Sequence, residues 1–447
     1  MRPSKNMRSV CSYSLLLGLS CTAIASFVSR EVILGAVSQD DRHSLGEIRH
    51  IKEPESVVAL SLEGKDVTDA DLPLLTRFKN LRHLHLSNNR ITDAGLRVLE
   101  SISTLRELDL DGNPVTDQGV QILSRLHKLW ALDLSRTGVG DAALKHIARL
   151  PELEVLRLDE TNVGDAGMLE LGKMLQLASL HVRSTRVTDF GLGHLSELKQ
   201  LELLSLDRCN VTDVGLRHIA DYAKLTTLGL SGTRVRGDGL RHLVNLALLE
   251  KLRLGQTTLE RDALKPLAGL TNLFELNLQQ CKLAETELQH VSAVKGLGIL
   301  DLSGATVGDF GVGCLAALPE LRELDLSGTM VTDKCGSEVA RICSLQRLNL
   351  SRTKVGDQTL GDLARLERLK YLFVADTAVT DEGIERFSKN MSVTYLDVSD
   401  TEVGDRGLAV LAERCYLSWL KVERTKVTRA GIDAFKQKCS VAKVHQD

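Results

Sequence analysis

A strict internal repeat constrains this sequence more than any other feature. The stretch LHLSNNRITDAGLRVLES at 84–101 returns, twenty-four positions later, as LDLDGNPVTDQGVQILSR at 108–125. The aliphatic residue that precedes the TD or GD pair recurs at the same step through sixteen copies, from Val67 to Val427, without insertion or deletion. Self-similarity at a fixed short period predicts a stacked array of like units, whereas 447 residues alone would suggest two or three domains.

Each unit carries two hydrophobic periodicities. With the repeat numbered from Leu81, apolar residues at positions four and six, such as Leu84 and Leu86, alternate with polar ones and predict a short strand. Positions sixteen and nineteen, such as Leu96 and Leu99, predict one face of a short helix. In one repeat, burial of about seven aliphatic side chains contributes about 2 kcal/mol each. This does not offset the loss of backbone conformational entropy, which costs about 1–2 kcal/mol for each of the 24 residues. Stacking must therefore supply the missing burial.

These columns resemble those of leucine-rich repeat proteins, from about Val57 to the C-terminus. The resemblance implies an α/β solenoid, or horseshoe, of sixteen 24-residue repeats, with parallel strands on the concave face and short helices on the convex face. Position nine is Asn at Asn89 and Asn113 but Thr or Cys in most other repeats. That column is similar to the ribonuclease-inhibitor-like, cysteine-containing subclass, which includes the repeat halves of F-box substrate receptors. Because we find no F-box-like module before the repeats, a ubiquitin-ligase adaptor is kept only as the alternative function.

The N-terminus has the pattern of a targeting segment. Arg2, Lys5 and Arg8 precede an uncharged run at 10–28, with the small residues AIA at 23–25. This order predicts a signal peptide or signal anchor at 1–29 and hence export to a periplasm, a cell surface or the medium. We expect an N-terminal cap at 30–56, with a helix around SLGEIRHI, the solenoid at 57–440 and a C-terminal cap at 441–447.

Charge and motifs limit the function. Lys and Arg total 56 against 59 Asp and Glu, so the formal net charge is -3 and the basic footprint of a nucleic-acid binder is absent. No motif in the sequence has the spacing of a catalytic nucleophile and its general base, and sixteen uninterrupted repeats leave no room for a catalytic insertion. The sequence therefore predicts a monomeric protein that is not an enzyme, uses no cofactor and binds a protein partner.

Two columns border each predicted helix. The Asp of the TD or GD pair, such as Asp93, lacks the further ligands of a calcium loop and is expected to cap its own helix by accepting a backbone N–H. The Gly two residues later, such as Gly95, would cost about 1 kcal/mol inside a helix and so predicts a close approach to the neighbouring repeat.

Two cysteines share one column. Cys415 and Cys439 occupy the same position in adjacent repeats, where the strand spacing of about 4.8 Å suits a disulfide. We expect this disulfide to close the C-terminal end of the array.

Function is expected in the variable strand positions, which the fold would present on the concave face. Aromatic residues occupy these positions on three consecutive strands near the C-terminus and are the predicted partner-binding residues. The alternative is that they pack on one another or under a terminal cap. The residues are Tyr371, Phe373, Tyr395 and Trp419.

A second concave candidate lies near the N-terminus. His83 and His85 share one strand, and Asp109 comes from the next, so these are candidate metal ligands. Two His residues without a further His column make a solvated polar face the favoured interpretation, and no metal site is predicted. A metal- or glycan-binding surface protein remains the other alternative to a protein-binding scaffold.

Overall fold

The computed structural model describes residues 45–413, 417–439 and 442–446. Its contacts divide the chain into two compact units. The first unit contains the described residues up to Arg234 together with Asn245–Lys251. The second unit contains Val235–Val244 and the described residues from Leu252 onward. Both units repeat a short strand and a short helix at the period that the sequence predicts.

The strands of the first unit are parallel and in register. Each strand pairs with the strand of the next repeat, so that Leu84 lies beside Leu60 and Leu108. The strands are β1 (Ala59–Ser61), β2 (His83–His85), β3 (Glu107–Asp109), β4 (Ala131–Asp133), β5 (Val155–Arg157), β6 (Ser179–His181), β7 (Leu203–Ser205) and β8 (Thr227–Gly229).

The second unit repeats this arrangement to the C-terminus. Its strands are also parallel, and each pairs with the strand of the next repeat. The strands are β10 (Glu275–Asn277), β11 (Ile299–Asp301), β12 (Glu323–Asp325), β13 (Arg347–Asn349), β14 (Tyr371–Phe373), β15 (Tyr395–Asp397), β16 (Trp419–Lys421) and β17 (Lys443–His445), while β9 (Lys251–Arg253) spans the sequence boundary between the units.

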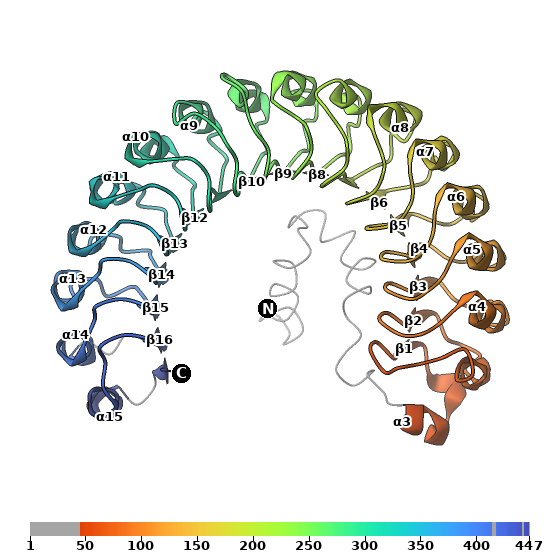
Figure 1. Cartoon of the computed structure of the whole chain (residues 1–447), viewed down its shortest axis with the longest axis horizontal. Helices are drawn as coiled ribbons and strands as arrows, with labels where there is room; N and C mark the ends of the chain where they lie inside the picture. Colours follow the sequence, from red (N-terminus) through yellow and green to blue (C-terminus); the bar gives the residue numbers. More distant parts are fainter. Residues whose placement is uncertain (1–44, 414–416, 440–441, 447) are drawn as a thin grey trace, which may run out of the picture. The chain divides into compact units, whose positions relative to one another are not determined.

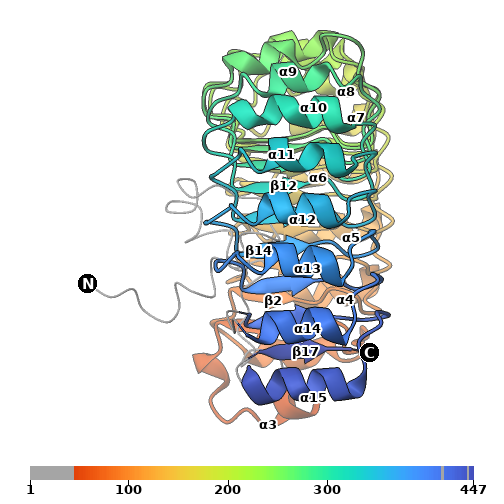
Figure 2. The same cartoon turned by 90° about the vertical axis from the view of Figure 1, so that its left-hand side faces the viewer.

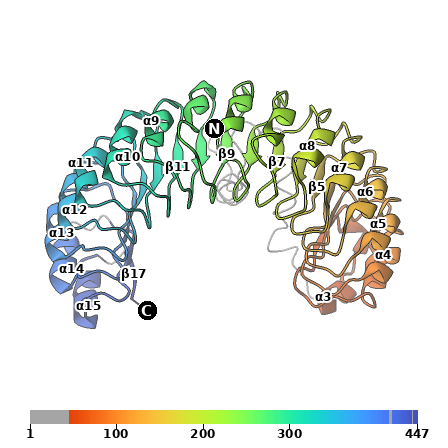
Figure 3. The same ribbon diagram turned by 45° about the horizontal axis from the view of Figure 1, so that its top comes forward.

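Helices cover the face of each unit opposite to its strands (Figure 1). Figure 3 shows α4–α8 in sequence order on the outer side of the first unit, and Figure 2 shows α10–α15 on the outer side of the second. The helices of the first unit are α3 (Leu45–His50), η3 (Pro54–Ser56), η4 (Leu72–Arg77), α4 (Asp93–Leu99), α5 (Asp117–Leu123), α6 (Asp141–Ile147), α7 (Asp165–Leu171), α8 (Asp189–His194) and η5 (Gly215–Ile219). Those of the second are η6 (Asp238–Leu243), η7 (Lys265–Gly269), α9 (Glu287–Val291), α10 (Asp309–Cys314), η8 (Leu315–Ala317), η9 (Asp333–Cys335), α11 (Gly336–Val339), α12 (Asp357–Leu363), α13 (Asp381–Phe387), α14 (Asp405–Ala412) and α15 (Arg429–Lys438).

The aliphatic columns form the core between strands and helices. Leu84, Leu86 and Leu96 are fully buried, and the same positions are buried in the other repeats. Position nine holds the turn after the strand. The Asn89 amide accepts from the backbone N–H of Val67 and donates to the carbonyl of Leu86, whereas a Thr in this column donates its hydroxyl to the carbonyl three residues earlier. The predicted fold class, an α/β leucine-rich repeat solenoid with strands and helices on opposite faces, is confirmed in each unit.

The Asp column does not act as predicted. The N-cap of α4 is Thr92, whose hydroxyl accepts from the N–H of Ala94, and Asp93 is the first helical residue. The carboxylate of the preceding repeat, Asp69, accepts from both the N–H and the hydroxyl of Thr92 at 2.8 and 2.6 Å. The same N–H contact to the next repeat is made by Asp93, Asp117, Asp141, Asp165, Asp189, Asp309, Asp333, Asp357, Asp381 and Asp405. These residues therefore brace the start of the next repeat's helix rather than capping their own. The prediction was wrong because this contact joins two repeats and no local pattern reveals it.

The glycines of the helix column make room for this brace. A Cβ built on Gly95 would lie 2.3 Å from Oδ1 of Asp69. The close approach between repeats that the Gly column predicted is therefore confirmed, and its partner is the bracing carboxylate.

The last repeat has Arg429 in place of the Asp, and three consecutive repeats earlier in the chain have Gly237, Arg261 and Glu285 there. Two of them form 3-10 turns, η6 and η7, and the third forms the short helix α9.

The ends of the array are closed by short elements. The helix expected around SLGEIRHI is α3, whose Ile48 is buried. Strand β17 pairs with β16 at the other end. The predicted signal segment at 1–29 and the first part of the predicted cap lie outside the described residues, as does Cys415. Cys439 is buried and disulfide-bonded, and the pairing with Cys415 stays a prediction.

Candidate functional site

The four aromatic residues predicted to bind a partner come together on the strand face of the second unit. They belong to β14, β15 and β16, and their rings follow one another across the sheet. Ring centroids are 6.1 Å apart for Tyr371 and Tyr395, 5.0 Å for Phe373 and Tyr395, and 6.0 Å for Tyr395 and Trp419. We call this set, Tyr371, Phe373, Tyr395 and Trp419, the aromatic row.

Cationic groups flank the aromatic row at both ends. The guanidinium of Arg347 lies 4.6 Å from the ring centroid of Phe373, and the amine of Lys443 lies 5.6 Å from that of Trp419. The imidazole of His445 stacks on Trp419 with centroids 4.3 Å apart and planes within 16°. The row thus continues into the last strand, β17.

The rings pack on one another and still reach the surface. Tyr371 is 44% exposed, while Phe373, Tyr395 and Trp419 are half-buried. Offset stacks and cation contacts of this kind are each worth about 0.5–1.5 kcal/mol and fix the rings in place. The mutual packing weighed as the alternative is present, and it leaves a rigid, partly apolar ridge.

A polar basin of about 880 Å³ adjoins the aromatic row on the same face. It lies over the ends of strands β10–β16 and the turns after them. One of its lining residues, Asp397, pairs in register with Phe373 of the aromatic row, so the two features are adjacent. Its carboxylates are Asp301, Asp325, Asp376, Asp397 and Asp400, and its cations are Arg352, Lys421 and Arg424.

The first unit carries a separate cluster around Glu107, at the N-terminal candidate site. Glu107 is fully buried, and its carboxylate lies between two imidazoles, with Oε2 2.9 Å from Nδ1 of His83 and Oε1 3.4 Å from Nε2 of His85. The other ring nitrogen of His85 lies 3.6 Å from Asp109. The carboxylates and the bond to Asp109 outweigh burial and raise the pKa of His85.

Two carboxyl groups of the following repeats, Asp133 and Asp159, have raised pKa values. Burial, followed by the charge of Asp109, raises the pKa of Asp133 to about 7, although Arg157 opposes the shift. Burial likewise raises the pKa of Asp159 to about 6. A carboxyl group that is about half protonated at pH 7, as Asp133 is, is a weaker metal ligand than a full carboxylate, and one ring nitrogen of each imidazole faces Glu107.

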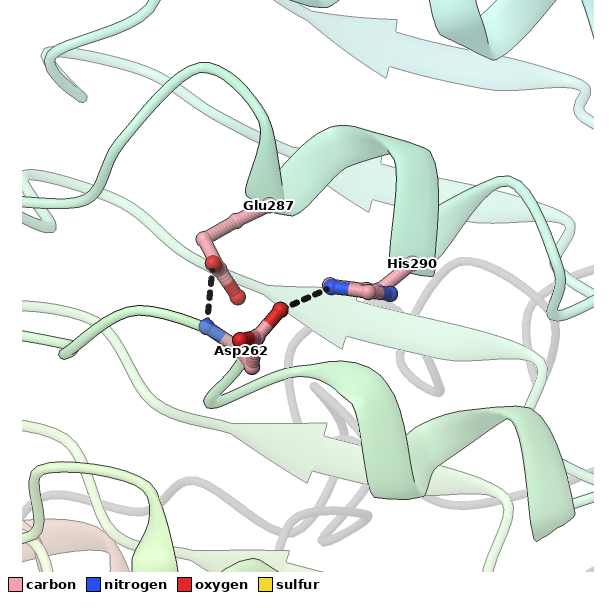
Figure 4. Close-up of side chains that lie close together, drawn as sticks. All are labelled: Asp262, Glu287 and His290. Carbon is pink, nitrogen blue, oxygen red and sulfur yellow. Dashed lines mark hydrogen bonds and ion pairs between the residues drawn. The ribbon is translucent and has the colours of Figure 1, made fainter.

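Elsewhere in the described ranges, possible metal-ligand atoms of Asp262, Glu287 and His290 all lie within 4.8 Å of one another. Figure 4 shows the Glu287 carboxylate directed at the backbone of Asp262, whose own carboxylate meets His290 at 3.1 Å. Both oxygens of Glu287 accept backbone N–H groups, from Asp262 and from Leu264. Glu287 thus braces a helical turn in a repeat that lacks the usual Asp, which accounts for this set without an ion.

Sequence reasoning located the aromatic row and the His residues but missed three features. It missed the basin, the role of Glu107 between two imidazoles, and the contribution of Arg347 and His445 to the aromatic row. One signal was available, because the tetrapeptide DLSG occurs at both 301–304 and 325–328. It places an Asp on the strand face of two neighbouring repeats.

Known repeat proteins match this chain in sequence pattern and in fold. Models of the leucine-rich repeat match residues 79–120, as two copies, and residues 389–412. Curated protein sequences contain no match to the chain. Within the described ranges, no helix has both the length and the apolar composition needed to cross a membrane.

Several solved structures share the fold. A leucine-rich repeat protein of Leptospira interrogans has 19% identity and a TM-score of 0.58, over 90% of this chain and 99% of its own. A chain of the mouse RP105/MD-1 complex has 17% identity and a TM-score of 0.55, over 87% and 79%. A chain of the TLR13–ssRNA13 complex also has 17% and 0.55, over 83% and 60%. At these identities the likeness is one of fold.

Proposed function

Because the chain is a leucine-rich repeat protein, we propose that it is an exported, non-enzymatic scaffold that binds a partner protein at the aromatic row of its second unit. Proteins of this kind serve as interaction scaffolds, and one structure of similar fold is that of the RP105/MD-1 complex. We further propose that the protein acts as a monomer. We also propose that it does not bind nucleic acid, in line with a net charge of -3.

The observation that carries the proposal is the aromatic row itself. Packing within the solenoid is complete without it, since the buried columns on β14–β16 are Leu372, Leu396 and Leu420, each fully buried. The aromatic side chains stand on the other side of the same strands. Large rings held rigid by their neighbours lose little entropy on binding, which is why interfaces favour such residues as anchors.

Ring orientation favours a protein partner over a glycan. Sugars bind aromatic residues through an open ring face. Trp419 already stacks with two neighbouring rings, Tyr395 with planes within 12° and His445 with planes within 16°. Tyr371 is 44% exposed, and its ring and hydroxyl suit apolar and hydrogen-bonding contacts from a polypeptide.

The test compares the aromatic row with a single exposed aromatic residue elsewhere on the second unit. Full-length protein is cross-linked to its neighbours in the compartment where it resides, and partners are identified by mass spectrometry. We expect a protein that is captured by the wild type and lost in Tyr395→Ala/Trp419→Ala. The control is Phe310→Ala, on helix α10, where the ring is 60% exposed.

Circular dichroism and melting must show that the double variant stays folded. Capture that survives in the folded double variant would contradict the proposal. A glycan array with the same proteins decides the runner-up function, because binding there that depends on Tyr395 and Trp419 would replace the protein partner by a sugar.

Export is a separate part of the proposal, and residues 1–29 carry it. A reporter fused to this segment should leave the cytoplasm, whereas a variant with Arg2, Lys5 and Arg8 changed to Glu should not. Cytoplasmic retention of the unchanged fusion would favour the intracellular adaptor alternative.

A further inference from the structure

Two neighbouring carboxylates in the polar basin lack a counter-charge. Asp301 ends β11 and Asp325 ends β12, and the two residues are paired in register. In the described part of the chain, each accepts hydrogen bonds only from neutral groups. Two like charges side by side on one sheet face repel one another, so the pair favours a cation nearby.

The neutral donors hold the two carboxylates in a fixed pose. Oδ1 of Asp301 accepts from the N–H and hydroxyl of Ser303, at 2.9 and 2.6 Å, and Oδ2 accepts from the Asn277 amide at 2.8 Å. Asp325 has the same set of donors from its own turn and from the amide of Asn349. A carboxylate has about four acceptor positions, so Oδ2 of each has one position left for a further donor.

An independent observation also points to a ligand. The hydroxyl oxygen of Ser399 is buried, with the residue only 2% exposed, and within the described residues it has no hydrogen-bond partner. It lines the end of the basin beside the aromatic row, four repeats along the chain from Asp301, where the other end of a bound segment would lie. A buried hydroxyl without a partner costs free energy, and a polar group entering the basin would satisfy it.

The charge balance of the basin decides the sign of that ligand. Of the three cations there, Arg424 is paired with Asp400 and Lys421 with Glu423. The basin's acidic groups outnumber its basic ones, and burial together with the charge of Asp325 raises the pKa of Asp301. An anion would be repelled, and a neutral sugar would leave the like charges facing one another.

We propose that the basin seats a Lys or Arg side chain of the partner, close to Asp301 and Asp325, while an apolar side chain of the same segment contacts the aromatic row. This rests on the proposed function, because it names the chemistry of the partner. The bound segment lies extended across the strands β11–β16. Its cation relieves the repulsion between the two carboxylates, and the fixed Ser and Asn donors leave little to reorganise on binding.

The test selects ligands without assuming the partner. Random peptides displayed on phage are selected on the full-length protein, and binding of synthetic copies is measured by fluorescence anisotropy. We expect selected peptides to contain Lys or Arg beside an aromatic or aliphatic residue. Asp301→Asn/Asp325→Asn should weaken them at least about tenfold, as loss of charged hydrogen bonds predicts. The isosteric Asn keeps an acceptor for the Ser donors but turns an NH2 group toward the Asn277 or Asn349 amide, so circular dichroism and melting must show that the variant stays folded.

A matched control removes two charges outside the basin. Glu320→Gln/Asp433→Asn changes two exposed carboxylates of the second unit and should leave affinity unchanged. Replacing the peptide's Lys or Arg by norleucine should abolish the difference between wild type and the basin variant. Affinity for the unmodified peptide should also fall as salt rises.

The outcomes separate the two proposals. Peptides that depend on Tyr395 and Trp419 but bind the basin variant equally well would overturn the cation inference and leave the proposed function standing. Peptides indifferent to both sets of variants would overturn both. Calorimetric binding of calcium to the wild type that the basin variant loses would make the basin an ion site and overturn the inference.

Discussion

Replacing Asp133 by Asn should stabilise the first unit, and the gain should depend on pH. Asp133 is 8% exposed at the end of β4, paired in register with Asp109. Burial and that neighbour raise its pKa in the folded protein to about 7, and the Arg157 guanidinium, 3.8 Å away, does not compensate. In the unfolded chain the pKa returns to the ordinary value of about 3.9.

The direction of the pH effect follows from proton uptake. Below about pH 4 both states are protonated at Asp133, and the raised pKa costs nothing. Between about pH 4 and 7 the folded state binds more protons, so stability falls as pH rises. Above pH 7 the full cost applies. A difference of about 3 between the two pKa values corresponds to about 4 kcal/mol at 1.36 kcal/mol each.

Hydrogen exchange measured by mass spectrometry gives the local readout. Peptides covering β3–β5 should exchange more slowly in Asp133→Asn than in the wild type at pH 8, with a gain of up to about 4 kcal/mol, and equally at pH 4. Comparison at the same pH cancels the intrinsic exchange rate. The Asn oxygen can still accept the N–H of Ser135, as Oδ1 of Asp133 does at 2.9 Å.

The exposed residue Asp221 supplies the control. Its carboxylate is 80% exposed, and Asp221→Asn should change nothing at either pH. Faster exchange of β3–β5 in Asp133→Asn at pH 8 would refute the reasoning, because it would mean that the attraction between Asp133 and Arg157 exceeds the cost of burial.

Three further changes test the packing between repeats and the buried Glu107. Asp165→Ala removes the brace that accepts from the N–H of Thr188 at 2.8 Å and should destabilise helix α8 by about 2 kcal/mol in hydrogen exchange, whereas Asp165→Asn should cost less. Gly237→Ala should cost at least about 2 kcal/mol in thermal unfolding, since φ is +128° and its Cβ would lie 2.2 Å from that of Ala263. Glu107→Gln should lower the pKa of His85, followed by NMR titration of its ring proton.

Each of these has an outcome that contradicts it. Unchanged exchange of α8 in Asp165→Ala would show that the brace adds no stability. An unchanged melting temperature in Gly237→Ala would mean that the turn relaxes without cost. A His85 pKa that stays the same in Glu107→Gln would show that Asp109 alone sets it.

The fold could be predicted from the sequence because every repeat has the same hydrophobic pattern. Leu84 and Leu86 alternate with polar residues and Leu96 follows at helical spacing, and these local periods repeat often enough to leave no other assignment. The positions of the aromatic row were also predictable, because a period of two fixes which side chains of β14–β16 share a face. These features depend only on backbone geometry within one repeat.

Only the tertiary structure decided what these side chains contact. Asp69 was expected to cap its own helix, yet it reaches Thr92 in the next repeat, because the stacking distance places the next N–H groups within hydrogen-bond reach. In the same way, Glu107 lies between two imidazoles, and Asp301 stands beside Asp325. Local sequence specifies which face a side chain takes, whereas the lateral spacing and register of neighbouring strands determine which charges meet there.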